Sequence, residues 1–275
     1  MSEPMEDLKY NFGCASCGDR QISEGDPIGS IGVSRMISRL DACFDRNDLA
    51  GAERLLRYWR EEAIALRDLR GELSVVNEQI GLYRRLSQQE PALEAVERGL
   101  TLIDSLGMED HVSAATVYLN AATTLKAFGE AVRVLPIYEK AERVYRRELP
   151  ADHPLVAGFY NNYALALVDF GRYSEAELCF HRAAAIMESR QDSLPEAAVT
   201  HVNLAQMYRR WEQKTPEEAL TEMERALTLL RDARIPHNSN YAFVLSKCAP
   251  AFREMGYERE ADLFDDEAKK IYAGN

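Results

Sequence analysis

The stretch FYNNYALALVDFGRYSEAELCFHRAAAIM, residues 159–187, decides the fold of this chain. It begins with an apolar run typical of a packed helix, reaches a glycine at Gly171, and continues as a second helix with small residues at Ala176 and Ala183. Glycine readily adopts the backbone conformation that ends one helix and allows a sharp turn before the next. The stretch therefore predicts a helical hairpin whose two helices approach closely.

The same hairpin pattern recurs along the chain. Aligned on Ala176, the small residue of the second helix returns after steps of 40, 42, 42, 43 and 42 residues. It falls at Ala52, Ala92, Val134, Ala176, Ala219 and Ala261. A second position, seven residues later and usually small, falls at Trp59, Gly99, Ala141, Ala183, Ala226 and Ala268. A fixed period of this length indicates an array of helical repeats.

The repeats organise nearly the whole chain. We expect an irregular N-terminal tail over residues 1–29 and one helical-repeat domain over residues 30–275. Turn-forming residues separate the units. The six expected units span approximately residues 30–67, 68–108, 110–150, 152–191, 194–233 and 237–273.

One unit carries a family resemblance. Residues 153–187 match the pattern H-P-x-V-A…N-N-x-A…G-x-Y-x-E-A-E…A and resemble tetratricopeptide (TPR) repeats, in the longer form found in kinesin light chains. The usual TPR period is about 34 residues. The resemblance is strong over residues 111–230, fair over 237–272 and weak over 31–106. It implies an all-α protein, a right-handed α-solenoid of about six TPR-like hairpins, that binds proteins or peptides.

Asparagine recurs at one position of the predicted first helices, at Asn120, Asn162 and Asn203, with Asn77 one residue out of register. At 100° per residue this position points away from the partner helix, toward the expected inner concave surface. An amide offers both donors and acceptors, which match the backbone of an extended peptide. In the families that the chain resembles, asparagine here contacts the ligand backbone. The alternative is that each amide bonds to a neighbouring unit.

Basic residues recur at a second position of the same helices. This position lies about 20° from one expected to face inward, so its side chains would line the same surface. They are Arg84, Lys126, Arg209 and Arg253. In a chain of net charge −12, such a row would form a locally cationic channel that attracts acidic side chains or a C-terminal carboxylate. The alternative is that these side chains are solvated and pair with local acids.

Composition and motifs exclude several classes of function. The net charge of −12 disfavours binding to nucleic acids or anionic membranes. No run of 18 apolar residues and no signal peptide is expected, and five irregularly spaced cysteines favour reduced thiols in the cytoplasm. Phosphate-loop, dinucleotide-binding and hydrolase motifs are absent, so we expect no enzyme and no cofactor. His153, directly before Pro154, is expected to serve a turn rather than act as a base.

The one metal-like spacing is Cys14 and Cys17, which would supply only half of a zinc site. We expect no metal there, but a disordered tail or a short segment packed on the first hairpin. Cys43, Cys179 and Cys248 are expected to be small packed side chains.

The sequence thus predicts a protein- or peptide-binding scaffold or adaptor that holds an extended segment, with acidic character, in its concave groove. The alternative is a structural helical-repeat module that self-associates and binds no peptide. The partner and the oligomeric state are left open.

Overall fold

The computed structural model describes residues 28–274, and within them it contains twelve α-helices, one short 3₁₀-helix and no strand. The predicted all-α fold is confirmed. The described residues form two compact units, 28–148 and 149–274. Cys14, Cys17 and residues 1–27 of the expected tail lie outside the described part of the chain.

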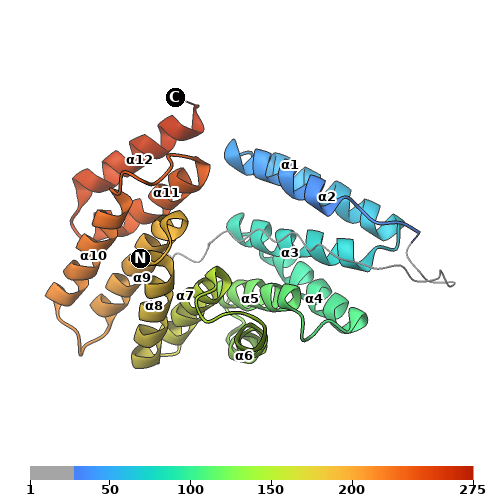
Figure 1. Ribbon diagram of the computed structural model, residues 1–275, viewed down its shortest axis with the longest axis horizontal. Helices are drawn as coiled ribbons and strands as arrows, with labels where there is room; N and C mark the ends of the chain where they lie inside the picture. The colour runs from blue at the N-terminus through green and yellow to red at the C-terminus, as the bar shows by residue number, and fades with distance from the viewer. Residues whose placement is uncertain (1–27, 275) are drawn as a thin grey trace. The chain divides into compact units, whose positions relative to one another are not determined.

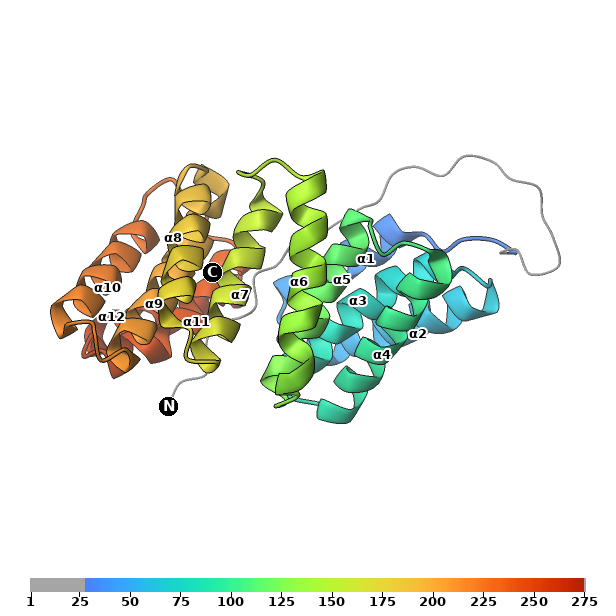
Figure 2. The ribbon, with the colours of Figure 1, turned by 90° about the horizontal axis from the view of Figure 1, so that it is seen from below.

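The first unit contains three helical hairpins (Figures 1 and 2). Its helices are α1 (Val33–Asp45), α2 (Leu49–Ala65), α3 (Leu69–Arg85), α4 (Gln89–Leu106), α5 (Val112–Ala127) and α6 (Ala131–Glu148). Each helix packs on the next in the chain, and the first helices of the second and third hairpins, α3 and α5, also pack on each other.

The second unit also contains three helical hairpins. Its helices are α7 (Pro154–Asp169), α8 (Tyr173–Glu188), the 3₁₀-helix η1 (Gln191–Ser193), α9 (Leu194–Arg210), α10 (Pro216–Leu230), α11 (Ser239–Glu254) and α12 (Glu258–Tyr272). The first helix of its middle hairpin, α9, packs on α8 and α10, and also on the other two first helices, α7 and α11.

The turns inside the hairpins use the left-handed backbone conformation. Gly129, Gly171 and Gly256, predicted as turn residues, have φ angles of 82°, 71° and 86°. In the first two hairpins Asn47 and Ser87 take this place, with φ angles of 51° and 55°. Asparagine tolerates this conformation better than most residues, whereas serine is less common there.

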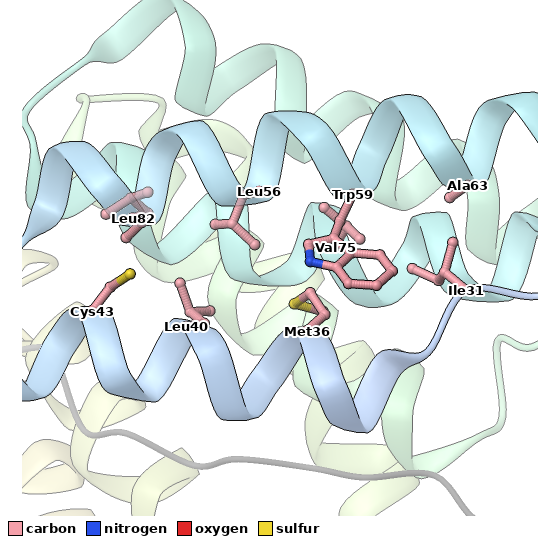
Figure 3. Close-up of a cluster of buried hydrophobic side chains, with 10 residues drawn as sticks. Ile31, Met36, Leu40, Cys43, Leu56, Trp59, Ala63, Val75 and Leu82 are labelled. Atoms are coloured by element: carbon pink, nitrogen blue, oxygen red, sulfur yellow. The ribbon is translucent and has the colours of Figure 1, made fainter.

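The small residues lie at the contacts between paired helices, as predicted. All six positions of the frame that contains Ala176 are at most 1% exposed. At Gly99 an added Cβ would lie 3.1 Å from Val117 Cγ1, which explains why glycine replaces alanine there. Trp59, which departs from the small-residue pattern, instead fills the core of the first hairpin, where its ring lies beside Met36 (Figure 3).

Two aspartates cap the N-termini of helices in the first unit in the same way. Asp48 accepts a hydrogen bond from Gly51 N at 2.7 Å, and Asp68 accepts one from Gly71 N at 2.9 Å. The second carboxylate oxygen of Asp68 accepts a hydrogen bond from Ile31 N, also at 2.9 Å. Such capping satisfies backbone N–H groups that have no partner within the helix. Asp68 therefore also fixes the segment that leads into α1.

An ion pair whose carboxylate is buried and whose guanidinium is partly exposed ties the second hairpin together. The carboxylate of Glu72 on α3 is 2% exposed and receives two hydrogen bonds from the guanidinium of Arg98 on α4, at 2.8 and 2.6 Å. Arg60 of α2 approaches the same carboxylate at 3.8 Å. Removing one partner of a buried pair leaves an uncompensated charge, which destabilises far more than the loss of a surface pair.

We therefore expect Arg98→Met to lower the free energy of unfolding by about 3 kcal/mol, because Glu72 stays buried without its main partner. Urea unfolding measures the change. The matched control is Arg57→Met, which breaks the exposed Arg57–Glu53 pair and should change stability by less than about 1 kcal/mol. Equal losses in the two variants would contradict this account of Glu72.

Candidate functional site

The polar side chains predicted to bind a ligand lie on the first helices of the hairpins. In the first unit, Asn77 lies on α3 and Asn120 on α5, and both are half-buried. Asn120 Nδ2 donates a hydrogen bond to Asn77 Oδ1 at 2.9 Å. An amide can donate two hydrogen bonds and accept two, so this bond uses only part of the capacity of Asn120.

The equivalent contact in the second unit joins a different pair. Asn203 Nδ2 of α9 donates to Asn161 Oδ1 of α7 at 3.2 Å. Asn162, which the sequence placed in this row, instead donates from its own Nδ2 to Gly158 O at 2.9 Å, inside α7. Asn161 is therefore the residue that sequence reasoning missed. A step of 42 residues back from Asn203 lands on Asn161, and this spacing could have identified it.

The expectation that Asn162 and Asn203 point away from the core is wrong for this structure. Asn162 is 5% exposed, Asn203 is 1% exposed and Asn161 is fully buried. The helical period predicts only which face of a helix packs on its partner within the same hairpin. The face predicted to be open is covered because α9 also packs on α7 and α11. The observed bonds between asparagines match the alternative in which these amides join neighbouring repeats, and their part in ligand binding stays a prediction.

The basic row is engaged by neighbouring residues rather than lining an open channel. Arg84 of α3 donates to Thr124 Oγ1 at 3.1 Å, across to α5. Arg209 of α9 reaches the carboxylate of Glu254 on α11 at 3.4 Å. These contacts agree with pairing to local groups, the alternative left open by the sequence.

The other two members of the basic row differ from each other. Arg253 turns to α12, where it donates to Asp262 at 2.8 Å and to Asp265 at 3.0 Å, and these hydrogen bonds raise the pKa of Arg253. Lys126 is half-buried in the last turn of α5.

A further polar contact joins α9 to α11 near their N-terminal ends. Asn240 Nδ2 of α11 donates to Glu196 Oε1 of α9 at 2.9 Å. Glu196 is 9% exposed, and burial raises the pKa of its carboxyl group. The α9–α11 contact is thus bridged by polar groups near both ends, Glu196–Asn240 at one and Arg209–Glu254 at the other.

The histidines near turns act as helix caps. His153 Nδ1 accepts a hydrogen bond from Leu155 N at 3.1 Å at the start of α7, which confirms the predicted turn role. Burial lowers the pKa of His153, so the ring is kept in the neutral form that can accept this bond. His111 caps α5 in the same way.

Within residues 28–274, no group of three or more histidine, cysteine or acidic side chains is arranged to hold a metal ion. Cys43 and Cys248 are buried, as predicted, and Cys179 is half-buried. In the same part of the chain, no helix is long and apolar enough to cross a membrane.

Comparison with known proteins shows the class of fold. No family model and no curated protein matches the sequence. Among solved structures, the chain is similar to TPR-like repeats of a kinesin light chain from Podosopora anserina, which are nearly identical to one another. The two chains are 19% identical, with a TM-score of 0.51, over 74% of this chain and 95% of that chain. A Rap protein complexed with Competence and Sporulation Factor is 15% identical, with a TM-score of 0.54, over 88% of this chain and 75% of that chain. The chain therefore has the fold of a TPR-like helical-repeat protein.

The contact between Asn161 and Asn203 predicts a measurable coupling. We expect Asn161→Ala and Asn203→Ala each to lower the free energy of unfolding by about 1–3 kcal/mol, because each removes the hydrogen bond between these two buried amides. The double variant should lose less than the sum, since the pair is already broken by either change. Urea unfolding of the four proteins measures this cycle.

Asn120→Ala provides the comparison, because Asn120 is half-buried and water can replace its lost bond. Asn120→Ala should lower the free energy of unfolding by less than Asn161→Ala or Asn203→Ala does. If the double variant loses as much unfolding free energy as the two single variants together, the 3.2 Å contact between Asn161 and Asn203 contributes no coupling.

Proposed function

We propose that this chain is a protein- or peptide-binding scaffold that holds an extended segment of its partner along the first helices of its hairpins. The observation that supports this most is that Asn77 and Asn120, on adjacent first helices, are half-buried, and that the bond between them uses only part of the hydrogen-bonding capacity of Asn120. A series of amides at the repeat spacing offers regularly placed donors and acceptors, which suits the regular backbone of an extended peptide.

The comparison with the Rap protein adds support from the fold. That protein is described in complex with Competence and Sporulation Factor, and its fold covers most of this chain. A fold of stacked helical hairpins presents a long surface made by successive first helices, and repeat proteins use such surfaces to bind extended segments. We apply this mode of binding to the present chain as part of the proposal.

Exposure separates the proposed ligand contacts from the residues that shape the surface. We assign direct contacts to the half-buried Asn77, Asn120, Arg84 and Lys126, whose side chains are in part accessible. The buried Asn203 would act indirectly, by holding α9 in register with α7 through Asn161, and the buried Asn162, which bonds inside α7, would support that helix.

The proposed acidic character of the ligand rests on the positive charge of the row Arg84, Lys126, Arg209 and Arg253. Arg209 and Arg253 are exposed, but each already pairs with carboxylates of the chain itself. A ligand carboxylate would have to compete with these pairs.

The proposal also covers the chain as a whole. We propose one repeat array over residues 30–275 with a tail over residues 1–29, acting in the cytoplasm and without catalysis. The buried or paired state of the titratable groups described above is consistent with structural roles for them.

A peptide display screen tests the proposal. The full chain would be screened against random peptides with free and with amidated C-termini, and selected peptides titrated by calorimetry. We expect Asn120→Ala to weaken binding by about fivefold to a hundredfold, which corresponds to about 1–3 kcal/mol for an unpaired buried ligand group. Lys126→Glu should weaken acidic peptides, and added salt should reduce that difference.

The matched control is Lys269→Glu, a charge reversal on the exposed face of α12 that should leave binding unchanged. Thermal melts would establish that each variant folds. If no peptide is retained and light scattering finds a tight oligomer, the chain is a self-associating module and the proposed function is wrong.

A further inference from the structure

The middle of α9 carries a buried histidine held between two carboxylates. His201 is 7% exposed. Its Nδ1 lies 2.5 Å from Glu222 Oε2 of α10, and its Nε2 lies 2.6 Å from Glu188 Oε1 at the end of α8. The second oxygen of Glu188 receives a hydrogen bond from Arg225 of α10. One imidazole ring therefore joins three helices that belong to two successive hairpins.

This geometry defines the protonation state of the ring. A carboxylate can only accept hydrogen bonds, and a neutral imidazole has a single N–H group. Both short contacts are satisfied together when both ring nitrogens donate, which makes His201 an imidazolium. Imidazole is a stronger base than a carboxylate, so the proton shared by the three groups resides on the ring.

The surrounding charges favour the imidazolium as well. Burial opposes the charge on the ring, but the hydrogen bonds to Glu222 and Glu188 outweigh burial and raise the pKa of His201 above its usual value. The charged groups that face this cluster are Glu188 from α8, and Glu222 and Arg225 from α10.

The other helices that pack on α9 place their charges elsewhere. On α11, Glu254 pairs with Arg209, Arg253 pairs with acids of α12, and Lys247 Nζ lies 5.6 Å from the centroid of the Phe243 ring. The charged residue of α7, Asp169, is the last residue of that helix. η1 carries Asp192, which pairs with Arg190.

We infer that the contact of His201 with Glu188 and Glu222, here called the clasp, is controlled by protonation and joins the hairpin α7–α8 to the hairpin α9–α10. The protonated ring holds the end of α8 against α9 and α10. When the ring loses its proton, it keeps one N–H and must release one carboxylate. Glu188 is the one released, because Arg225 still neutralises it through direct hydrogen bonds, whereas Arg225 acts on Glu222 only through a weaker coulombic attraction.

The clasp goes beyond the proposed function and does not depend on it, since it concerns the contact between hairpins rather than any ligand. Its stabilising effect follows from the sign of the shift. A pKa that is raised in the folded state contributes stability that is fully present below the unfolded pKa of about 6.5 and is lost as the pH rises through the folded value. Alkaline pH should therefore loosen the end of α8 and the connection through η1.

The first test uses the unmodified protein. Carbon-13 labelling of histidine lets NMR follow the ring of His201 from pH 5 to pH 10, with His201→Gln for assignment. We expect an imidazolium at pH 6.5 that titrates above the usual histidine range. Hydrogen exchange of residues 184–193, corrected for the intrinsic pH effect, should accelerate over the same interval. A ring that is neutral at pH 6 would overturn the inference.

The second test compares urea unfolding from pH 6 to pH 9 in two variants. Glutamine has one donor group and one acceptor and so imitates the neutral ring, and His201→Gln should remove the decline in stability that the original protein shows as the pH rises. His237→Gln removes an exposed histidine that pairs with Glu267, and should preserve that decline. If the decline persists in His201→Gln, the clasp does not control it and the inference fails. If His201→Gln does not fold, the protonation state of His201 measured by NMR in the unmodified protein decides whether the inference holds.

Discussion

Close approach of paired helices is the constraint on which the rest of this structure depends. Ala176 and Ala183 of α8 are both fully buried, and their lack of bulk lets α7 and α8 lie side by side while Phe180 fills the space between hairpins. A larger residue at either alanine would force the helices apart, because protein interiors leave no room for an added side chain without displacement of the neighbours. The repeated small residues thus set the geometry of each hairpin before any polar contact forms.

Polar contacts then determine how one hairpin sits on the next within each unit. Small apolar faces pack in several registers with similar energy, but an amide pair such as Asn161–Asn203, or Glu72 of α3 beside Arg60 of α2, has its partner in only one. Leaving such groups buried without partners is unfavourable by more than most single packing contacts. Glu72, Asn203 and His201 therefore select one stacking arrangement among those that the small residues allow.

These contacts have a consequence for the proposed binding surface. A segment held along successive first helices meets amides whose spacing is already fixed, so little order has to be created on binding. In the first unit the half-buried Asn77 and Asn120 combine this fixed spacing with accessible hydrogen-bonding capacity. In the second unit the amides of Asn161, Asn162 and Asn203 are buried.

The sequence by itself determined the helical hairpins and the fold class. The recurrence of Ala176 and the turn glycines defines which residues pair inside one hairpin, because those contacts are close in the chain and follow the helical period. The sequence did not determine which polar faces stay open. Asn162 of α7 and Asn203 of α9 are buried because neighbouring first helices cover the faces that a single hairpin would expose, and His201 meets Glu188 because α8 of the preceding hairpin packs on α9. Only the tertiary structure decides this, since the periodicity of one helix reveals its own apolar face and not the identity of the helix that packs on its polar one.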